Sequence, residues 1–353
     1  MRQIGQRWSG ASGLAWLPDN RSLVVAASQG GTDPQQIWSL AFPDGRVRRL
    51  THDLNSYSSV SMTANAKLLL TVQNQQVSSL WMQESNDAES ARELTTPGSR
   101  YEGANGMTWT SDGRLLYTLK GGAGMELWFR EPGSGEAKRL FSENASIENP
   151  SISPDGRYVT FASNRGPNVW HLWRYDIQDG GFKQLTSGHG ELYGTASRDG
   201  NTLVFVELDK DGLWRQAGSG GASTQMTSEA DEFPSLSPDG KLVAFRFEDE
   251  AQNKPRMGVR SADGGPVVKI FDFAARAARE IEWLPDGAGL SYIAEENGVA
   301  QVWVQPLAGG AARPVTNFHN CSIFRYAWSA DGKQLAMSRG NWNSDVVLFR
   351  DGQ

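Results

Sequence analysis

Four histidines are the side chains of this sequence best suited to metal or acid–base chemistry: His52, His171, His189 and His319. A metal site needs three or four ligands that converge on one point. His189 with Glu191 offers two neighbouring ligands, but the four histidines stand in separate segments of the chain. The sequence therefore predicts no metal site and no cofactor. His171 stands beside a strand tryptophan, and we interpret it as structural.

Catalytic motifs are not recognisable. A nucleophilic serine of the G-x-S-x-G type sits on a turn between a strand and a helix, and the nearest match, Gly10–Gly13, has the wrong spacing. Glu229, Asp231 and Glu232 form an acidic stretch that could serve acid–base chemistry, and we interpret it as a solvated loop. The loop 209–212 lacks the glutamate that a calcium loop carries at its twelfth position. We expect no catalytic residues and no enzymatic activity.

The elements that position these side chains follow one recurring pattern. Eight copies of a turn, of which Ser153-Pro154-Asp155-Gly156 is a well-formed example, stand 40 to 47 residues apart. Proline sets the first corner of the turn, aspartate bonds to the backbone ahead of it, and glycine accepts positive φ at the exit. The turns are centred on Asp19, Asn65, Asp112, Asp155, Asp199, Asp239, Asp286 and Asp331.

Each copy contains four strand-like segments in the same order. One strand precedes the turn, one follows it, a third carries a tryptophan, and a short fourth often ends in Leu-Thr. Four short antiparallel strands repeated at this period are typical of a propeller blade. We predict an all-β fold in which residues 1–353 form a single β-propeller domain of eight four-stranded antiparallel blades, or seven if one copy lies outside the ring. The third-strand tryptophans should pack between blades.

The ends of the chain suggest how the ring closes. The last copy shows strands at 323–328, 334–338 and 345–349 and lacks a fourth. The N-terminal Arg2-Gln3-Ile4 has the pattern of a fourth strand, so we expect residues 2–7 to complete the last blade and remove its exposed edge. The run Phe273–Arg279 has helix-forming composition, and we expect one or two helical turns there.

Charge and hydropathy exclude several classes of protein. The net charge of −6 argues against a nucleic-acid partner, which requires a basic surface. No run of about 18 apolar residues is present to span a membrane, and the N-terminus lacks the apolar segment of a signal peptide. The single cysteine, Cys321, leaves the cellular compartment open. We expect a monomer, or part of a longer fused chain.

The first strand of each copy offers the best candidate binding site. About six to eight residues before the turn aspartate, the chain must pass the mouth of the central channel. Carboxylates, arginines and aromatic rings gathered at one mouth suit a protein partner, a peptide or a small polar ligand. The candidate ligand-binding residues are Tyr57, Tyr101, Asn105, Glu148, Asn149, His189, Tyr193, Glu232, Arg279, Glu280 and Arg325.

The Ser-Pro-Asp-Gly-Arg/Lys turns and the strands that follow them, best seen at 153–161 and 237–245, resemble the PD40 (TolB-like, WD40-like) β-propeller family. The C-terminal stretch 324–340 resembles the end of propellers fused to bacterial serine/threonine kinases or winged-helix regulators. These resemblances imply a non-catalytic sensory or protein-binding module, extracytoplasmic or periplasmic if it belongs to a membrane-anchored regulator. The alternative they leave open is a metal-dependent propeller enzyme such as an oligogalacturonate lyase.

Overall fold

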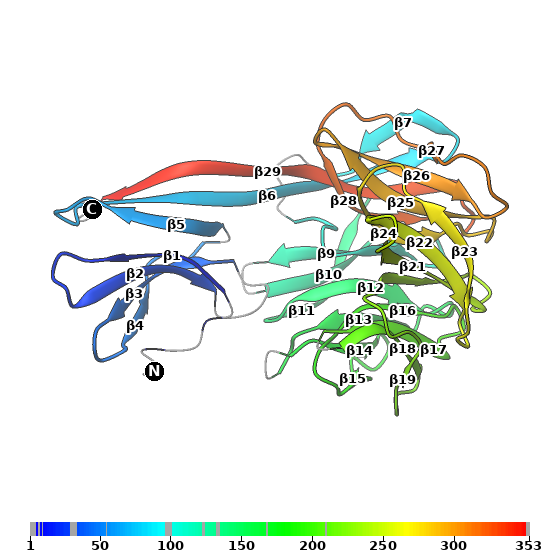
Figure 1. Cartoon of the computed structure of the whole chain (residues 1–353), viewed down its shortest axis with the longest axis horizontal. Coiled ribbons are helices and arrows are strands. Elements are labelled where there is room, and N and C mark those ends of the chain that lie inside the picture. The colour runs from blue at the N-terminus through cyan, green and yellow to red at the C-terminus, as the bar shows by residue number, and fades with distance from the viewer. Residues whose placement is uncertain are drawn as a thin grey trace. The chain divides into compact units, whose positions relative to one another are not determined.

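The computed structural model describes residues 5, 8, 10–28, 34–53, 55–95, 101–121, 124–131, 135–166, 169–208 and 210–350. The chain divides into two compact units, which we treat separately: unit 1 contains residues 1–77 and 341–353, and unit 2 contains residues 78–340. All regular structure in the described residues is β-strand, as predicted (Figure 1). No helix in this part of the chain is long and apolar enough to cross a bilayer.

Five sheets of four antiparallel strands follow one another through unit 2. Their strands are β8–β11 (Met107–Trp109, Leu115–Gly121, Gly124–Arg130, Ala137–Glu143), β12–β15 (Ile147–Ile152, Tyr158–Ser163, His171–Asp176, Phe182–Gln184), β16–β19 (Glu191–Ala196, Thr202–Glu207, Lys210–Ala217, Thr224–Gln225), β20–β23 (Glu232–Leu236, Leu242–Asp249, Lys254–Ser261, Val267–Asp272) and β24–β27 (Ala277–Trp283, Gly289–Glu296, Val299–Pro306, Arg313–Pro314).

A further sheet is assembled from both ends of the chain. Strand β28 (Ser322–Trp328) pairs with β29 (Gln334–Arg350), β29 pairs with β6 (Leu68–Glu84), and β6 pairs with β7 (Asp87–Glu93). Within unit 2 this sheet uses residues 334–340 of β29 and 78–84 of β6. The last copy of the repeat is therefore completed by strands of the second copy.

Unit 1 contains the rest of the strands. Strands β1–β4 (Gly10–Trp16, Ser22–Ser28, Gln36–Ala41, Val47–Arg49) form a four-stranded sheet. Strand β5 (Ser56–Met62) pairs with the first half of β6, and its Tyr57 ring lies 5.9 Å from the ring of Phe349 in β29. Strand β1 contacts β5, so the two sheets of this unit lie against each other.

The first strands of the six sheets in unit 2 contact one another in circular order. Strand β8 contacts β12, β12 contacts β16, β16 contacts β20, β20 contacts β24, and β28 contacts β8. The circle is completed between β24 and β28, where the Tyr326 hydroxyl donates to the carbonyl of Glu280 at 2.8 Å. Six first strands thus surround one central space.

Four expectations about the ring and the domain need correction or remain open. Eight blades, or seven, are not confirmed, and residues 345–349 do not form a separate third strand of the last copy, because residues 334–350 belong to the single strand β29. Strand β6 likewise continues through residues 73–77, which contain neither glycine nor proline to favour a turn. Closure by residues 2–7 lies outside the described residues, apart from Gly5. The prediction of one domain over residues 1–353 stays a prediction.

The predicted helical turns at Phe273–Arg279 are wrong, because the second half of this run begins strand β24. Residues 277–279 pair with residues 293–295 of β25, and Arg279 Nη2 donates to the carbonyl of Ile323 at 2.9 Å. Pairing with a neighbouring strand therefore outweighs the local helix propensity of the alanines and arginines.

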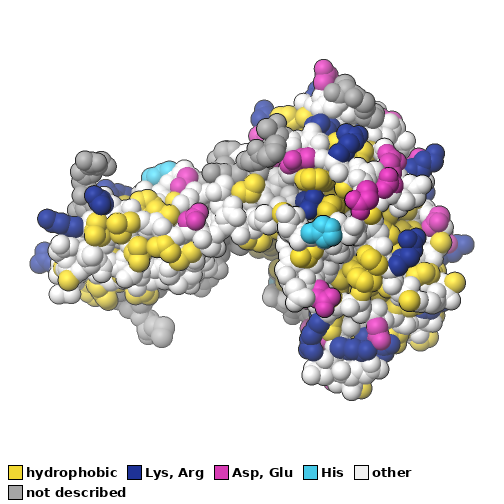
Figure 2. Space-filling view, turned by 90° about the horizontal axis from the view of Figure 1, so that it is seen from above, with side chains coloured by type: hydrophobic (Ala, Val, Ile, Leu, Met, Phe, Trp, Pro, Cys, Tyr) yellow, Lys and Arg dark blue, Asp and Glu magenta, His cyan; other side chains and the backbone are white. Residues whose placement is uncertain are grey.

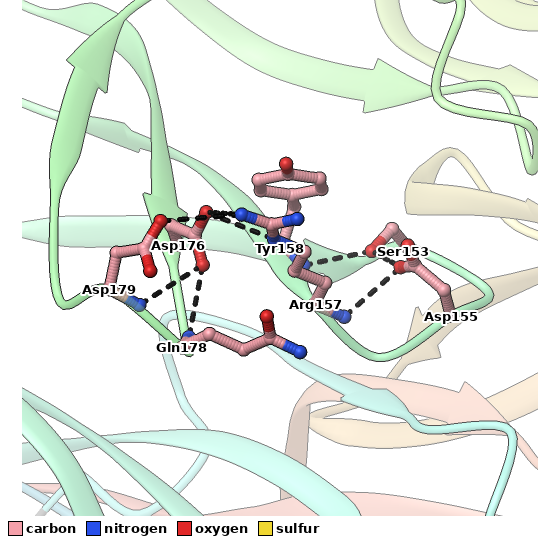
Figure 3. A network of polar contacts seen from close by, with 7 residues as sticks. All are labelled: Ser153, Asp155, Arg157, Tyr158, Asp176, Gln178 and Asp179. Atoms are coloured by element: carbon pink, nitrogen blue, oxygen red, sulfur yellow. Dashed lines mark hydrogen bonds and ion pairs between the residues drawn. The ribbon is translucent and has the colours of Figure 1, made fainter.

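The turn aspartates hold the hairpins as the sequence predicted. In Figure 3 the Ser153 hydroxyl and the Arg157 amide both donate to Asp155 Oδ1, at 2.5 and 3.0 Å. Gly156 has φ of 70°, as the exit of the turn requires. The hydrogen bond from Ser153 holds the pKa of Asp155 below its usual value. The same serine–aspartate bond recurs in the turns of Asp199, Asp239 and Asp331.

Hydrophobic clusters join consecutive sheets of unit 2, as predicted for the third-strand tryptophans. Trp173 packs on a cluster that combines Leu127 of β10 with Phe161 of β13. Trp303 packs on a cluster of β22 and β25, and Trp81 on one that joins the last two sheets. All three rings are half-buried, so each contributes less than the roughly 3 kcal/mol of a fully buried large side chain. The tryptophans therefore hold the sheets of the ring together.

Threonines at the end of the fourth strand fix the third strand from behind. In five copies the threonine Oγ1 accepts a hydrogen bond, at 2.8–3.0 Å, from the backbone N–H of the residue just before the third-strand tryptophan. The recurring threonine therefore has a structural explanation, because its hydroxyl satisfies a backbone amide of the third strand. The threonines are Thr51, Thr95, Thr186, Thr227 and Thr316.

Candidate ligand-binding site

A cavity of about 350 Å³ lies inside the circle of first strands, and all six strands line it. Its lining residues form two layers, in which every sheet contributes one residue. The first layer stands six residues before each turn centre and consists of Gly106, Asn149, Tyr193, Phe233, Glu280 and Arg325. The second layer stands four residues before it and consists of Thr108, Ser151, Thr195, Ser235, Glu282 and Ala327.

β-Bulges place the side chains of the first layer. The pairing register shifts by one residue at this layer in β12, β16, β20, β24 and β28. Tyr193, Phe233 and Glu280 have φ of 51°, 50° and 55°. Such angles are uncommon for bulky side chains and cost of order 1–3 kcal/mol each. Bulges that re-aim side chains are frequent next to functional sites, so the strain favours a binding role for this layer.

An ion pair dominates the charged side of the cavity. Arg325 Nη1 lies 3.0 Å from Glu280 Oε1, and both side chains are more than four-fifths buried. Burial raises the pKa of the Glu282 carboxyl to about 8; the charge of Glu280 adds to the rise and Arg325 opposes it. Burial also raises the pKa of Glu148, which the charges of Arg325 and Glu280 influence in opposite directions. At neutral pH Glu282 is therefore mostly protonated and able to donate a hydrogen bond.

Tryptophans that follow the second layer tie neighbouring first strands together. Trp109 Nε1 donates to the carbonyl of Ala327 at 3.1 Å, and Trp283 Nε1 donates to the carbonyl of Ser235 at 2.9 Å. Both acceptors are second-layer residues of the preceding sheet. The wall of the cavity is thus preorganised, because its strands are bonded to each other beside the lining positions.

Four of the predicted rim residues line the cavity: Asn149, Tyr193, Glu280 and Arg325. Glu148 stands one residue before this layer and interacts electrostatically with Arg325. Asn105 contributes its carbonyl, which accepts from the Asn149 amide at 2.9 Å. The structure therefore brings six of the eleven candidates to one region of unit 2.

The other five candidates lie elsewhere or are engaged by other partners. Glu232 pairs with Arg246 at 2.7 Å, and Arg279 pairs with Glu295 at 3.6 Å. Lys120 lies over the Tyr101 ring, and exposed His189 has its Nδ1 3.5 Å from Glu207. Tyr57 belongs to unit 1, where its hydroxyl donates to Asp53 at 2.6 Å. None of these five lines the cavity.

Sequence reasoning missed the whole second layer, and Gly106 and Phe233 of the first layer. Phe233 stands six residues before its turn aspartate, as Arg325 does, but the sequence analysis selected its neighbour Glu232 from this strand. The second layer is found by counting four residues back from each turn, a signal that the spacing of the repeat already contained. Glu282 is the charged member of that layer.

Two of the histidines lie beside glutamates. His171 is buried and its Nδ1 lies 2.7 Å from Glu191 Oε2, which also accepts from the Thr186 hydroxyl at 2.8 Å. Glu191 thus contacts His171, whereas His189 contacts Glu207. Among the residues that the structure describes, no three or more His, Cys, Asp or Glu side chains are arranged to hold a metal ion.

Comparisons with known proteins agree with this architecture. The PD40 family model, described as the TolB beta propeller domain, matches residues 99–278. The uncharacterized protein Atu1656 of Agrobacterium fabrum is 29% identical over 175 residues, which are 46% of this chain and 59% of that protein. The Tol-Pal system protein TolB of Anaeromyxobacter dehalogenans is 27% identical over 118 residues, which are 33% of this chain and 27% of that protein. The chain thus spans less than two thirds of each of these relatives.

A solved structure resembles most of the chain. The putative TolB from Agrobacterium tumefaciens superposes with a TM-score of 0.63 at 18% identity, and the match covers 75% of this chain and 99% of that one. At this identity the likeness concerns the fold alone.

Proposed function

We propose that this chain, which belongs to the PD40 family of TolB β-propeller domains, is a non-catalytic binding module. Its ring receives a protein segment or a small polar ligand. The observation that carries the proposal is the double layer of position-matched side chains around the cavity. A volume of about 350 Å³ lies at the lower end of the range for ligand pockets. The six strands converge on one space, and this arrangement forms a binding site that needs no reactive side chain.

The chemistry of the lining favours a ligand with both charged and polar groups. Arg325 and Glu280 present opposite charges, and Glu282 is a hydrogen-bond donor at neutral pH. The second layer adds the hydroxyls of Thr108, Ser151, Thr195 and Ser235. A relative named as a Tol-Pal system protein supports a protein partner, one of whose side chains or chain ends would enter the cavity.

We also infer that the binding ring has six blades rather than eight or seven. The circular order of six sheets in unit 2 supports this count. The putative TolB structure also supports the count of six. The match covers 99% of that structure and three quarters of this chain, and unit 2 makes up about the same share of this chain. The alternative function, a metal-dependent propeller lyase, has no observation in its favour among the described residues.

The proposal is tested by a ligand screen followed by variants of the lining. Peptides and small polar compounds are screened by thermal shift on the full chain, and affinities of the hits are measured by calorimetry. Arg325→Met and Glu280→Gln should each weaken a channel ligand about tenfold or more, as loss of one charged contact does. Arg46→Met, which alters an exposed pair in unit 1, is the control. If every hit binds both channel variants as it binds the wild type, the assignment of the site fails.

A further inference from the structure

One carboxyl group in the channel cavity has no partner among the described residues. Arg325 and Glu280 neutralise each other as an ion pair of 3.0 Å. Glu282 also lines the cavity, and its carboxyl forms neither a hydrogen bond nor an ion pair in the part of the chain that the structure describes. The other arginine of the lining, Arg198, is exposed in the turn of Asp199. The ring thus surrounds an acidic group that it does not neutralise itself.

Three carboxyl groups of this region depend on one arginine for compensation. Burial raises the pKa of Glu282 to about 8, Glu280 adds to the rise, and Arg325 is the one cation among the described residues that opposes it. Burial also raises the pKa of Glu148, and Arg325 is again the opposing cation. A positive charge that entered the cavity would stabilise the ionised forms of these groups. The channel is therefore complementary to a cation.

Two aromatic rings border the same space. Tyr193 of β16 and Phe233 of β20 are consecutive members of the first layer, and their ring centroids lie 4.7 Å apart. Strand β20 contacts β24, which carries Glu282. Burial raises the pKa of the Tyr193 hydroxyl, and the charges of Glu148 and Glu280 raise it further, so these carboxylates lie near the ring. Faces of aromatic rings attract organic cations, most strongly where water is excluded.

We propose that the channel binds an alkylammonium group, from the lysine side chain of a partner protein or from a free amine, between the rings of Tyr193 and Phe233 and the carboxyl of Glu282. This inference rests on the proposed binding function of the ring and adds the chemical class of the ligand. The ammonium donates to the carboxylate, while the methylene groups pack on the rings. A metal ion fits less well, because no three acidic, histidine or cysteine side chains of the described residues are arranged to hold one.

The outer surface offers no comparable site on the face that Figure 2 shows. On this face of unit 2, Asp and Glu are interspersed with Lys and Arg and form no continuous acidic area. The net charge of −6 attracts any cation diffusely, but that attraction is screened at physiological salt and does not depend on a single side chain. Binding in the channel can therefore be recognised by its dependence on Glu282.

Proton release gives this site a measurable signature. Free Glu282 holds a proton below about pH 8, and a bound ammonium favours the carboxylate, so binding expels the proton. Affinity for the amine should therefore rise with pH, by up to about tenfold per pH unit from pH 6, and level off above pH 8. The ammonium of lysine stays charged over this range.

The other titratable groups around Glu282 do not reverse this dependence. Tyr193 and Tyr326 have pKa values raised above the ordinary value of 10, so both hydroxyls stay protonated between pH 6 and pH 9. Glu148 also has a raised pKa, and its ionisation strengthens cation binding in the same direction. The charged pairs beside them are Glu280 with Arg325 and Glu232 with Arg246.

The test is calorimetry on the full chain at pH 6, 7, 8 and 9 in physiological salt. The probes are a capped glycyl-lysyl-glycine peptide, its uncharged norleucine counterpart, and the free diamine cadaverine. The lysine peptide should bind at least about tenfold more tightly than the norleucine peptide at pH 8. Tighter binding of the lysine peptide than of cadaverine identifies a protein side chain as the source of the ammonium, and the reverse identifies a free amine.

Three variants locate the bound ammonium. Glu282→Gln should weaken the lysine peptide about tenfold or more at pH 8 and remove most of the rise with pH. Phe233→Leu should weaken it about threefold and keep the rise. The matched control is Glu143→Gln, which changes a buried carboxyl that pairs with Arg165 and does not line the cavity. This control should change the affinity less than about twofold at every pH.

No binding of either amine at pH 8, equal binding of the norleucine peptide, or equal affinities of Glu282→Gln and the wild type would overturn the inference. Displacement of the lysine peptide by an equal concentration of Ca²⁺ would assign the site to a metal ion instead. The binding function of the ring is judged separately. If ligands from the screen respond to Arg325→Met but are not displaced by the lysine peptide, the ring binds ligands and the ammonium assignment alone fails. Melting curves show whether each variant is folded.

Discussion

Arg325 and Glu280 stand at equivalent positions of consecutive sheets, six residues before their turn aspartates, and form an ion pair of 3.0 Å across the junction of β28 and β24. Next to this pair, the Tyr326 hydroxyl bonds to the Glu280 carbonyl. One contact thus joins two sheets of the ring and at the same time lines the cavity. Changes at this pair should therefore affect both stability and binding.

Replacing Arg325 by methionine should destabilise the protein. The variant leaves Glu280 buried without its cation, and breaking a buried pair from one side costs about 3–5 kcal/mol. Urea unfolding at pH 7 measures the loss. Arg215→Met, which breaks a largely exposed pair with Asp263, should cost less than about 1 kcal/mol. Equal losses in the two variants would show that the channel pair is not buried as described.

Glu282 should make stability fall as pH rises. Its folded-state pKa of about 8 lies above the ordinary value of 4.5, so between these values the folded protein holds a proton that the unfolded chain has released. Stability then decreases with pH, by up to about 1.4 kcal/mol per pH unit, and the loss is complete above pH 8. Unfolding free energies of the wild type and Glu282→Gln from pH 5 to pH 9 test this. Parallel pH curves would contradict it.

Gly106 is the position of the first layer where a side chain should not fit. A Cβ built there would lie 2.3 Å from Cδ of Pro150 in the neighbouring sheet, and φ is 140°. Gly106→Ala should therefore lower the unfolding free energy by about 2 kcal/mol more than Gly113→Ala, whose φ is also positive but whose Cβ would meet nothing within 4 Å. Thermal unfolding of both variants makes the comparison, and similar melting temperatures would refute the close contact.

Thr186 should contribute more to the free energy of unfolding than an exposed threonine does. Its Oγ1 accepts from the Leu172 amide and donates to Glu191 Oε2, and all these groups are buried. Thr186→Val keeps the shape, leaves the buried Leu172 amide unsatisfied and removes one of the two bonds to Glu191 Oε2, which should cost about 2–3 kcal/mol. Exposed Thr224 of β19 is the control, because Thr224→Val should change stability by less than about 0.5 kcal/mol. The comparison is made by urea unfolding.

The parts that the sequence predicts well are those decided within one copy of the repeat. The turn of Asp155 and the threonine at position 186 depend on residues close in sequence, so their patterns are visible in a single chain. The pairing partners of β6 and β29 depend instead on which strand, distant in sequence, has a free edge. Neither the period of the repeat nor its composition specifies that partner. The strand at 277–279 is a similar case, because pairing with β25 outweighed local helix propensity.

The candidate site also contains residues that the sequence predicts and residues that it does not. Asn149, Tyr193, Glu280 and Arg325 were found because polar residues recur at a fixed distance before the turn. Phe233 occupies the equivalent position but carries an apolar ring, which lies 4.7 Å from the Tyr193 ring. The bulge in β20 places this ring at the cavity, and a bulge cannot be recognised from residue types alone. Position within the repeat was therefore a better guide than polarity.

The sharing of strands between the second and last copies can be tested by cross-linking. Gln334 of β29 donates its side-chain amide to Glu84 of β6 at 3.3 Å, and the Ser85 amide donates to the Lys333 carbonyl at 2.7 Å. In an eight-bladed ring of self-contained copies, positions 84 and 334 would belong to separate blades. Cysteines at these two positions, in a Cys321→Ser background, should therefore form a disulfide under mild oxidation.

The cross-link is read as a mobility shift on non-reducing gels and by mass spectrometry of the joined peptides. The matched control replaces Glu84 and Lys241 by cysteine, since Lys241 occupies the corresponding turn of β20–β23, which is a different sheet from that of β6. A disulfide in the first pair and none in the control supports the composite sheet of β28, β29, β6 and β7. No disulfide in the first pair, in a protein that melts as the wild type does, would favour blades that each close on their own strands.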